Sequence, residues 1–265
     1  MSDNCSRDPA GSFAVFGAAT LRAKGQPVAL DLRSCDGADV SDVTNAQATT
    51  IAPGSADAIS VTMGGNDFGF SQVLVGCLSR GCRSLDQDTD QFPGFTHEPG
   101  RSDWDVLQQR IADALITLKS KLTPHGQVYL LTYPIPFPAQ PDETCIRNTA
   151  PLNQTNRDLA NAATNRLDTT IIAAATAANQ RAAAPFVTMV EWRTGLDVAP
   201  RIVTDQAGVV RRVRDNPNGI CSPEPMVNGI VTTTELSDSF HPTDRGLHFA
   251  GDAVAKAIGV HNQAG

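Results

Sequence analysis

Apolar, strand-like segments alternate with helical segments along this chain, and that alternation restricts its fold more than any other feature. The helical segments are separated by short runs rich in Val, Ile and Leu, each bounded by turn residues. The expected strands are residues 27–32, 57–63, 127–132 and 186–191, and the expected helices are residues 13–24, 68–78, 102–122, 152–184 and 243–258. This order predicts one α/β domain over residues 1–265, a three-layer α/β/α sandwich around a mostly parallel sheet.

Composition excludes several classes of function. The 265 residues carry 21 basic and 28 acidic side chains, a net charge of −7, which argues against binding of nucleic acid. No uninterrupted apolar run approaches the roughly 18 residues that a membrane-spanning helix needs. Residues 201–214 are expected to form a β-hairpin around Gln206-Ala207-Gly208.

Ligands of parallel sheets bind at the carboxyl ends of the strands, so the loops that follow the expected strands are the places to look for chemistry. The loop after residues 57–63 reads Gly64-Gly65-Asn66-Asp67. Two glycines allow a sharp turn, and the Asn66 amide can then donate to a developing oxyanion. The same residue types also occur in ordinary turns.

A second motif precedes the expected C-terminal helix. The sequence there reads Asp238-Ser239-Phe240-His241-Pro242. His241 is a candidate general base, and Asp238, three residues earlier, can accept a hydrogen bond from the imidazole and fix its tautomer. An Asp and a His in a solvent-exposed turn would give the same pattern.

Together these two motifs resemble those of the SGNH hydrolases, also called the GDSL esterase and lipase family, and most closely the secreted, disulfide-containing actinobacterial members. The resemblance implies a Ser-His-Asp mechanism for hydrolysis of carboxylic esters of small molecules or lipids, without a metal or organic cofactor. His241 and Asp238 match the triad base and acid, while Gly37 and Asn66 match the oxyanion donors. A non-catalytic binding module on the same fold is the alternative.

Six cysteines favour an exported protein with three disulfides, although six allow 15 pairings and the sequence itself does not choose among them. The resemblance implies Cys5–Cys35, Cys77–Cys82 and Cys145–Cys221. The spacing of the cysteines and histidines does not indicate structural zinc. The first residues lack the apolar stretch of a signal peptide, so we expect an extracellular protein whose signal lies outside this sequence.

The sequence departs from the family at the nucleophile. The first block of the family, a central strand that ends in Gly-Asp-Ser, has no counterpart before Gly37, and Ser12 is only a weak candidate. That strand should lie between residues 27–32 and 57–63. Three explanations remain open: a fragment or misassigned start of a longer reading frame, a separate segment or chain that supplies the strand, and a degenerate, inactive member.

Overall fold

The structure is a computed structural model that describes residues 10–70, 73, 92, 95, 98–149, 152–192, 201–204, 210–213, 215–229 and 241–264. Most of the helix expected over residues 68–78 lies outside these residues, as do Asp238 and three of the cysteines, Cys5, Cys77 and Cys82.

Three of the four expected parallel strands are confirmed. They are β1 (Ala56–Val61), β2 (Leu122–Leu131) and β3 (Val187–Val190), which form a parallel sheet in the order β1-β2-β3. Val128 of β2 pairs with both Ile59 and Val187, so β2 is the central strand of the three. The continuous apolar run in β2 follows from this position, because both faces of a central parallel strand are covered.

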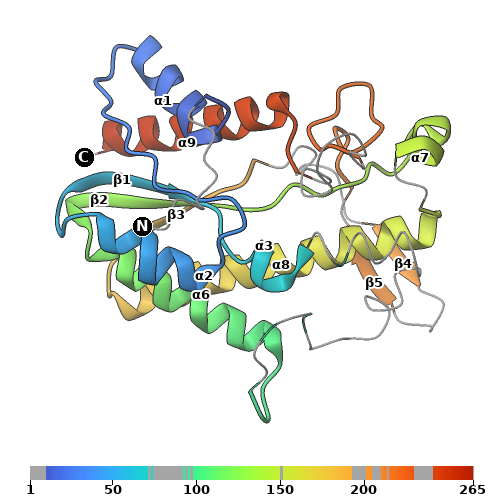
Figure 1. Cartoon of the computed structure of the whole chain (residues 1–265), viewed down its shortest axis with the longest axis horizontal. Helices are drawn as coiled ribbons and strands as arrows, with labels where there is room; N and C mark the ends of the chain where they lie inside the picture. Colours follow the sequence, from blue (N-terminus) through green and yellow to red (C-terminus); the bar gives the residue numbers. More distant parts are fainter. Residues whose placement is uncertain are drawn as a thin grey trace.

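Helices cover both faces of the sheet, as the alternation predicts (Figure 1). The helices α6 (Asp103–Lys119) and α8 (Gln154–Arg181) pack on one face against Val128 and Leu130. Helix α9 (Asp244–Ala264) packs on the other face against Tyr129 and Leu131, and α1 (Phe13–Ala23) lies against α9. Alternate side chains of β2 therefore enter opposite layers of a three-layer α/β/α fold.

The expected strand over residues 27–32 is wrong. These residues form no regular element, and Pro27, Ala29, Leu30 and Asp31 are exposed. A strand requires a hydrogen-bonded neighbour, and β1 cannot be that neighbour if another strand belongs between them. No backbone hydrogen bond joins residues 57–61 to any described residue outside β2, so β1 is an edge strand within the described sheet.

The expected start of the third strand, at residue 127, is also misplaced. Strand β2 begins at Leu122, which pairs with Ala56, and its next paired residue is Gln127, opposite Ala58. The four residues 123–126 thus bulge opposite Asp57 alone. Gly126 is required in this bulge, because a Cβ there would lie 2.7 Å from the carbonyl oxygen of Ala56.

Smaller elements surround the sheet. The expected hairpin is confirmed as β4 (Arg201–Thr204) and β5 (Val210–Val213), which pair with each other in a separate antiparallel sheet. The short helices α2 (Val40–Asp42), η1 (Val43–Gln47), η2 (Ala48–Thr50) and α3 (Gly65–Phe68) flank β1, and α7 (Glu143–Thr149) precedes α8. No helix among the described residues is both long and apolar enough to cross a membrane.

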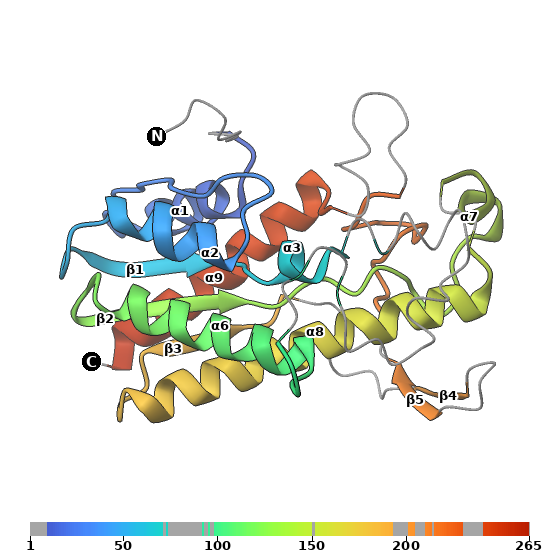
Figure 2. The ribbon, with the colours of Figure 1, turned by 60° about the horizontal axis from the view of Figure 1, so that its bottom comes forward.

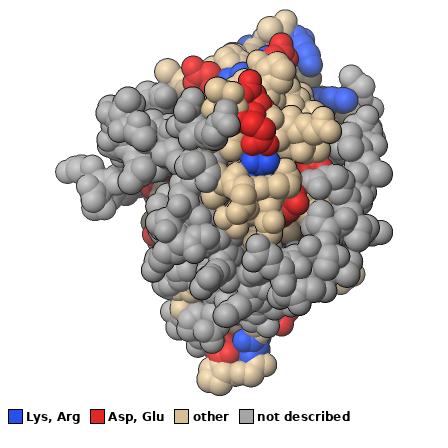
Figure 3. Space-filling view, turned by 90° about the vertical axis from the view of Figure 1, so that its right-hand side faces the viewer, with Lys and Arg blue, Asp and Glu red and all other residues tan. Residues whose placement is uncertain are grey.

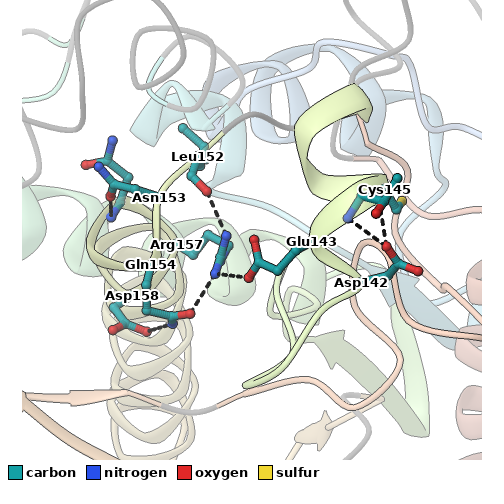
Figure 4. A network of polar contacts seen from close by, with 10 residues as sticks. Asp142, Glu143, Cys145, Leu152, Asn153, Gln154, Arg157 and Asp158 are labelled. Atoms are coloured by element: carbon teal, nitrogen blue, oxygen red, sulfur yellow. Dashed lines mark hydrogen bonds and ion pairs between the residues drawn. The ribbon is translucent and has the colours of Figure 1, made fainter.

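A buried arginine and a disulfide fix the segment around α7. The guanidinium of Arg157 donates to Glu143 at 2.8 Å, to the carbonyl of Leu152 at 2.7 Å and to Gln154 at 2.7 Å (Figure 4). The Cys145–Cys221 disulfide ties α7 to the segment that precedes the start of α9. The contacts of Arg157 and the disulfide together hold the N-terminal end of α8 to the loops beyond the sheet.

We predict that Gly251→Ala destabilises the protein by about 1–3 kcal/mol, because α1 and α9 touch through their glycines. A Cβ at Gly251 would lie 2.7 Å from the Gly17 nitrogen and 2.7 Å from the Phe13 carbonyl oxygen. Gly259→Ala on the same helix is the matched control, since a Cβ there meets nothing within 4 Å. We expect this control to stabilise the protein by up to about 1 kcal/mol. Denaturant unfolding measures both, and equal effects of the two substitutions would contradict the packing described.

Candidate active site

Two of the segments singled out by sequence lie at the end of the sheet to which all three strands point. The turn that follows β1 and the segment that leads into α9 both lie at this end (Figures 1 and 2). Figure 3 faces the same side, where charged side chains of both signs lie among uncharged ones on the described surface. The location agrees with the rule that ligands of parallel sheets bind at the carboxyl ends of the strands.

The turn after β1 depends on its two glycines for different reasons. Gly64 has a φ of +101°, a left-handed conformation that other residues rarely adopt. Gly65 is restricted by space instead, because a Cβ there would lie 2.8 Å from the ring and the hydroxyl of Tyr133. The backbone can therefore reverse sharply at the strand end, and helix α3 begins at once with Asn66 in its first turn.

Gly37 and Asn66, which lie 29 positions apart, come together at this turn. The Asn66 Nδ2 donates to the carbonyl oxygen of Ala38 at 2.9 Å, and its side chain is exposed. An amide has two N–H donors, so one holds the side chain in place and the other remains for a ligand. The Gly37 N–H donates to no described residue, and its φ of +72° is one that glycine tolerates.

Asp67, whose side chain is buried, also connects the turn after β1 to the segment that follows Gly37. Its Oδ2 accepts a hydrogen bond from the Val40 N–H at 3.0 Å, and the residue is 9% exposed. Burial raises the pKa of the Asp67 carboxyl, and the hydrogen bond from Val40 offsets part of that effect. Asn66 and Asp67 thus hold the loop around Gly37 against the turn from both sides.

The backbone around His241 is fixed, although its side chain is exposed. The carbonyl oxygen of His241 accepts from the Asn228 N–H at 2.8 Å, and the Thr243 hydroxyl donates to the Pro225 carbonyl at 3.0 Å. The His241 imidazole makes no hydrogen bond to any described residue. Its expected partner, Asp238, lies outside the described residues, so the Asp238–His241 pair stays a prediction.

Ser12, the weak candidate for the nucleophile, has a structural role. It is the N-cap of α1, and its Oγ accepts from the Val15 N–H at 3.4 Å. Phe68 and Phe137, two aromatic residues near this end of the sheet in sequence, are buried core residues. Phe70 is only partly buried and packs between two apolar clusters.

The disulfide Cys145–Cys221 is present, as the resemblance implies, and Cys35 is also disulfide-bonded. Among the described residues no cysteine is free, and no three His, Cys, Asp or Glu side chains are grouped so that they could hold a metal ion.

The sequence analysis missed Tyr133, which lies directly beyond the end of β2. Its hydroxyl accepts a hydrogen bond from the Gly65 N–H at 3.0 Å, and its own N–H donates to Asp168 at 2.7 Å. The signal was available, because a tyrosine that follows an apolar strand lies at the same sheet end as the Gly64–Asn66 turn.

The fold and these residues define a three-layer α/β protein in which the Gly37 N–H and one N–H of Asn66 donate to no described residue at the carboxyl end of the sheet. Its fold is shared by an extracellular lipase from Streptomyces rimosus, with a TM-score of 0.61 and 18% identity. It is also shared by phospholipase A1 from Streptomyces albidoflavus, with a TM-score of 0.62 and 19% identity. Each alignment covers 97% of this chain and 89% of the other.

The sequence is similar to that of a lipase from the same genus. It is 25% identical to Lipase 1 of Streptomyces coelicolor over 223 residues, which cover 83% of this chain and 66% of the length of that protein. No family model matches the chain. These comparisons confirm the resemblance to actinobacterial lipases that the sequence motifs predict.

We predict that Asp67→Asn changes how stability depends on pH. A carboxyl whose pKa is raised by folding stabilises the protein fully below its unfolded pKa of about 3.9, and that contribution disappears as pH rises through the folded pKa. The asparagine keeps an acceptor for Val40 and does not ionise, so the variant gains stability relative to wild type as pH increases from 4 to 7. Urea unfolding at several pH values measures the difference.

The exposed Asp36→Asn, on the neighbouring loop, is the control. We expect its stability difference from wild type to stay nearly constant over the same range. An Asp67→Asn curve that runs parallel to wild type from pH 4 to 7 would contradict the assignment.

Proposed function

We propose that this protein is an extracellular hydrolase of carboxylic esters, acting on lipid or small-molecule esters by an SGNH-type Ser-His-Asp mechanism. The observation that carries the proposal is the pair of free donors at the end of β1. The Gly37 N–H and the second N–H of the Asn66 amide are both without described partners, and Ala38 holds the amide in a fixed orientation. Such preorganised donors stabilise an oxyanion in acyl transfer.

The chemistry requires four groups with separate tasks. A serine hydroxyl attacks the ester carbonyl carbon while His241 accepts its proton, and the carbonyl oxygen becomes an oxyanion held by Gly37 and Asn66. Collapse of this intermediate expels the alcohol, which receives the proton from His241. Water, deprotonated by His241, then hydrolyses the acyl-serine and releases the carboxylic acid. Asp238 orients the imidazole and stabilises its protonated form.

The serine is supplied by a strand that ends in Gly-Asp-Ser and pairs with the open edge of β1. Two observations support a position for this strand at the open edge of β1. The backbone of residues 57–61 has no hydrogen bond to a described residue on the side away from β2. Residues 27–32, the apolar segment expected to flank the same strand, are without regular structure, and Leu30 is 38% exposed. A strand between the two segments would satisfy the backbone of both.

Likeness to extracellular lipases supports both the reaction and the location. The described disulfide and the disulfide-bonded Cys35 fit an oxidising compartment. The solved structures that share this fold include an extracellular lipase and a phospholipase A1. These features support an extracellular location and an ester of a lipid or a small molecule as the substrate.

Completion of the sheet tests this proposal directly. A strand of about six apolar residues followed by Gly-Asp-Ser is added to the purified chain as a synthetic peptide, and separately fused ahead of residue 1. A fluorophosphonate probe reports an activated serine, and hydrolysis of p-nitrophenyl esters reports turnover. We expect both signals only with the added strand, on its serine, and neither in the His241→Ala variant.

Two results would contradict the proposal. Labelling of a serine within residues 1–265 of the bare chain would place the nucleophile elsewhere, with Ser12 the first residue to mutate. If the protein binds the added strand but shows neither labelling nor turnover, it is a binding module on this fold.

We further predict that Asn66→Ala in the completed protein lowers kcat by about 10²–10³-fold with little change in KM, since the lost donor acts on the transition state. Asn45→Ala is the matched control, because Asn45 is an exposed asparagine whose Nδ2 donates to Ser41 at 3.0 Å. This control should retain the wild-type kcat. A loss of less than about threefold in Asn66→Ala would remove Asn66 from the oxyanion site.

A further inference from the structure

Tyr133 joins three elements at the end of the sheet where the oxyanion donors lie. The residue follows β2, its hydroxyl accepts from the Gly65 N–H at 3.0 Å, and its backbone N–H donates to Asp168 Oδ1 at 2.7 Å. Asp168 is a buried residue of α8. The turn that carries Asn66 is thus connected through one residue, Tyr133, to the end of β2 and to α8.

The contact between Tyr133 and the turn is close as well as polar. The ring lies where a side chain on Gly65 would be, with ring atoms and hydroxyl 2.8 Å from the position of a Cβ. The hydroxyl therefore contacts the residue directly after Gly64, the residue with the left-handed backbone.

The tyrosine is suited to a fixed structural contact because its hydroxyl stays neutral. Desolvation raises the pKa of Tyr133 to about 12, and the nearby carboxyls of Asp67 and Asp168 act in the same direction. A neutral hydroxyl can accept a hydrogen bond, as this one does from the Gly65 N–H.

We propose that Tyr133 is a positioning residue of the active site, whose hydroxyl holds the Gly64–Asn66 turn so that the Asn66 amide meets the oxyanion. This proposal rests on the proposed ester hydrolysis for its catalytic consequence, but not for its structural part. Tyr133 touches neither the substrate nor the reacting atoms in this account. It acts through Gly65, the residue immediately before Asn66.

The structural part is tested by Tyr133→Phe, which removes the hydroxyl and keeps the ring. We expect the Gly65 amide to exchange its hydrogen about three- to tenfold faster in the variant, as measured by NMR, because it loses its acceptor. Tyr129→Phe is the matched control: Tyr129 is the other tyrosine of the chain, is buried in β2, and has no hydroxyl contact to the turn. The control should leave the Gly65 exchange rate unchanged.

The catalytic part is tested in the sheet-completed protein. We expect Tyr133→Phe to lower kcat by about tenfold or more with KM within about twofold, since misplacement of a catalytic group by a fraction of an ångström is costly. Tyr129→Phe should keep the wild-type kcat. Unchanged Gly65 exchange in Tyr133→Phe would overturn the proposal, as would faster exchange with an unchanged kcat.

Failure of the proposed function is distinguishable from these outcomes. If the completed wild-type protein shows no turnover, ester hydrolysis is refuted, and the exchange measurement still decides whether Tyr133 holds the turn. If the completed wild-type protein is active, and Tyr133→Phe leaves either the Gly65 exchange rate or kcat unchanged, then the positioning role is refuted and ester hydrolysis is not.

Discussion

The backbone hydrogen bonds that β2 makes with β1 on one side and β3 on the other determine where the candidate site lies. Parallel pairing brings the carboxyl ends of all three strands to one edge of the sheet. The Gly64–Asn66 turn, Tyr133 and Trp192 follow these ends in order. The Trp192 indole donates to the Thr132 carbonyl at 2.7 Å, so the chain segments beyond β2 and β3 are also joined.

The other constraint is the incomplete pairing of β1. Its second edge meets no described strand, and Asp57 and Ala58 are exposed where a strand of an α/β sheet is ordinarily covered. If this edge were buried without a partner strand, each unpaired backbone group would cost about 1–3 kcal/mol, which a protein of ordinary stability does not sustain over a whole strand. The same edge lies beside the turn that carries Asn66. In our account, the strand that completes the sheet therefore also brings the nucleophilic serine to the catalytic residues.

The sequence predicted the elements whose stability is local or whose neighbours are present. The helix expected over residues 102–122 is confirmed as α6, which Ser102 caps with Asp103 and Asp105 in its first turn, and the apolar run of β2 marks the centre of the sheet. The strand expected over residues 27–32 failed because its formation depends on a neighbour, which a pattern of apolar residues does not reveal. Tyr133 went unpredicted for a related reason: its role consists of one contact with a glycine 68 positions away.

For the site, the motifs identified Gly37 and Asn66, and the structure places both segments in contact. The sequence did not show that the two segments are joined by Ala38, which accepts from Asn66, and by Asp67, which accepts from Val40. Val40 donates through its backbone N–H, so any residue type would serve there. The pairing of His241 with Asp238 remains a prediction from their spacing of three residues.

A crystal structure of the sheet-completed protein, inactivated with a dialkyl p-nitrophenyl phosphate, tests the central claim most directly. Displacement of p-nitrophenolate leaves a phosphoryl group on the nucleophile, and its oxygen occupies the position of the oxyanion. Our account predicts this oxygen within about 3 Å of both the Gly37 nitrogen and the Asn66 Nδ2, with the His241 imidazole beside the modified serine. A phosphoryl oxygen bound by other donors, or a modified serine far from the end of β1, would contradict it.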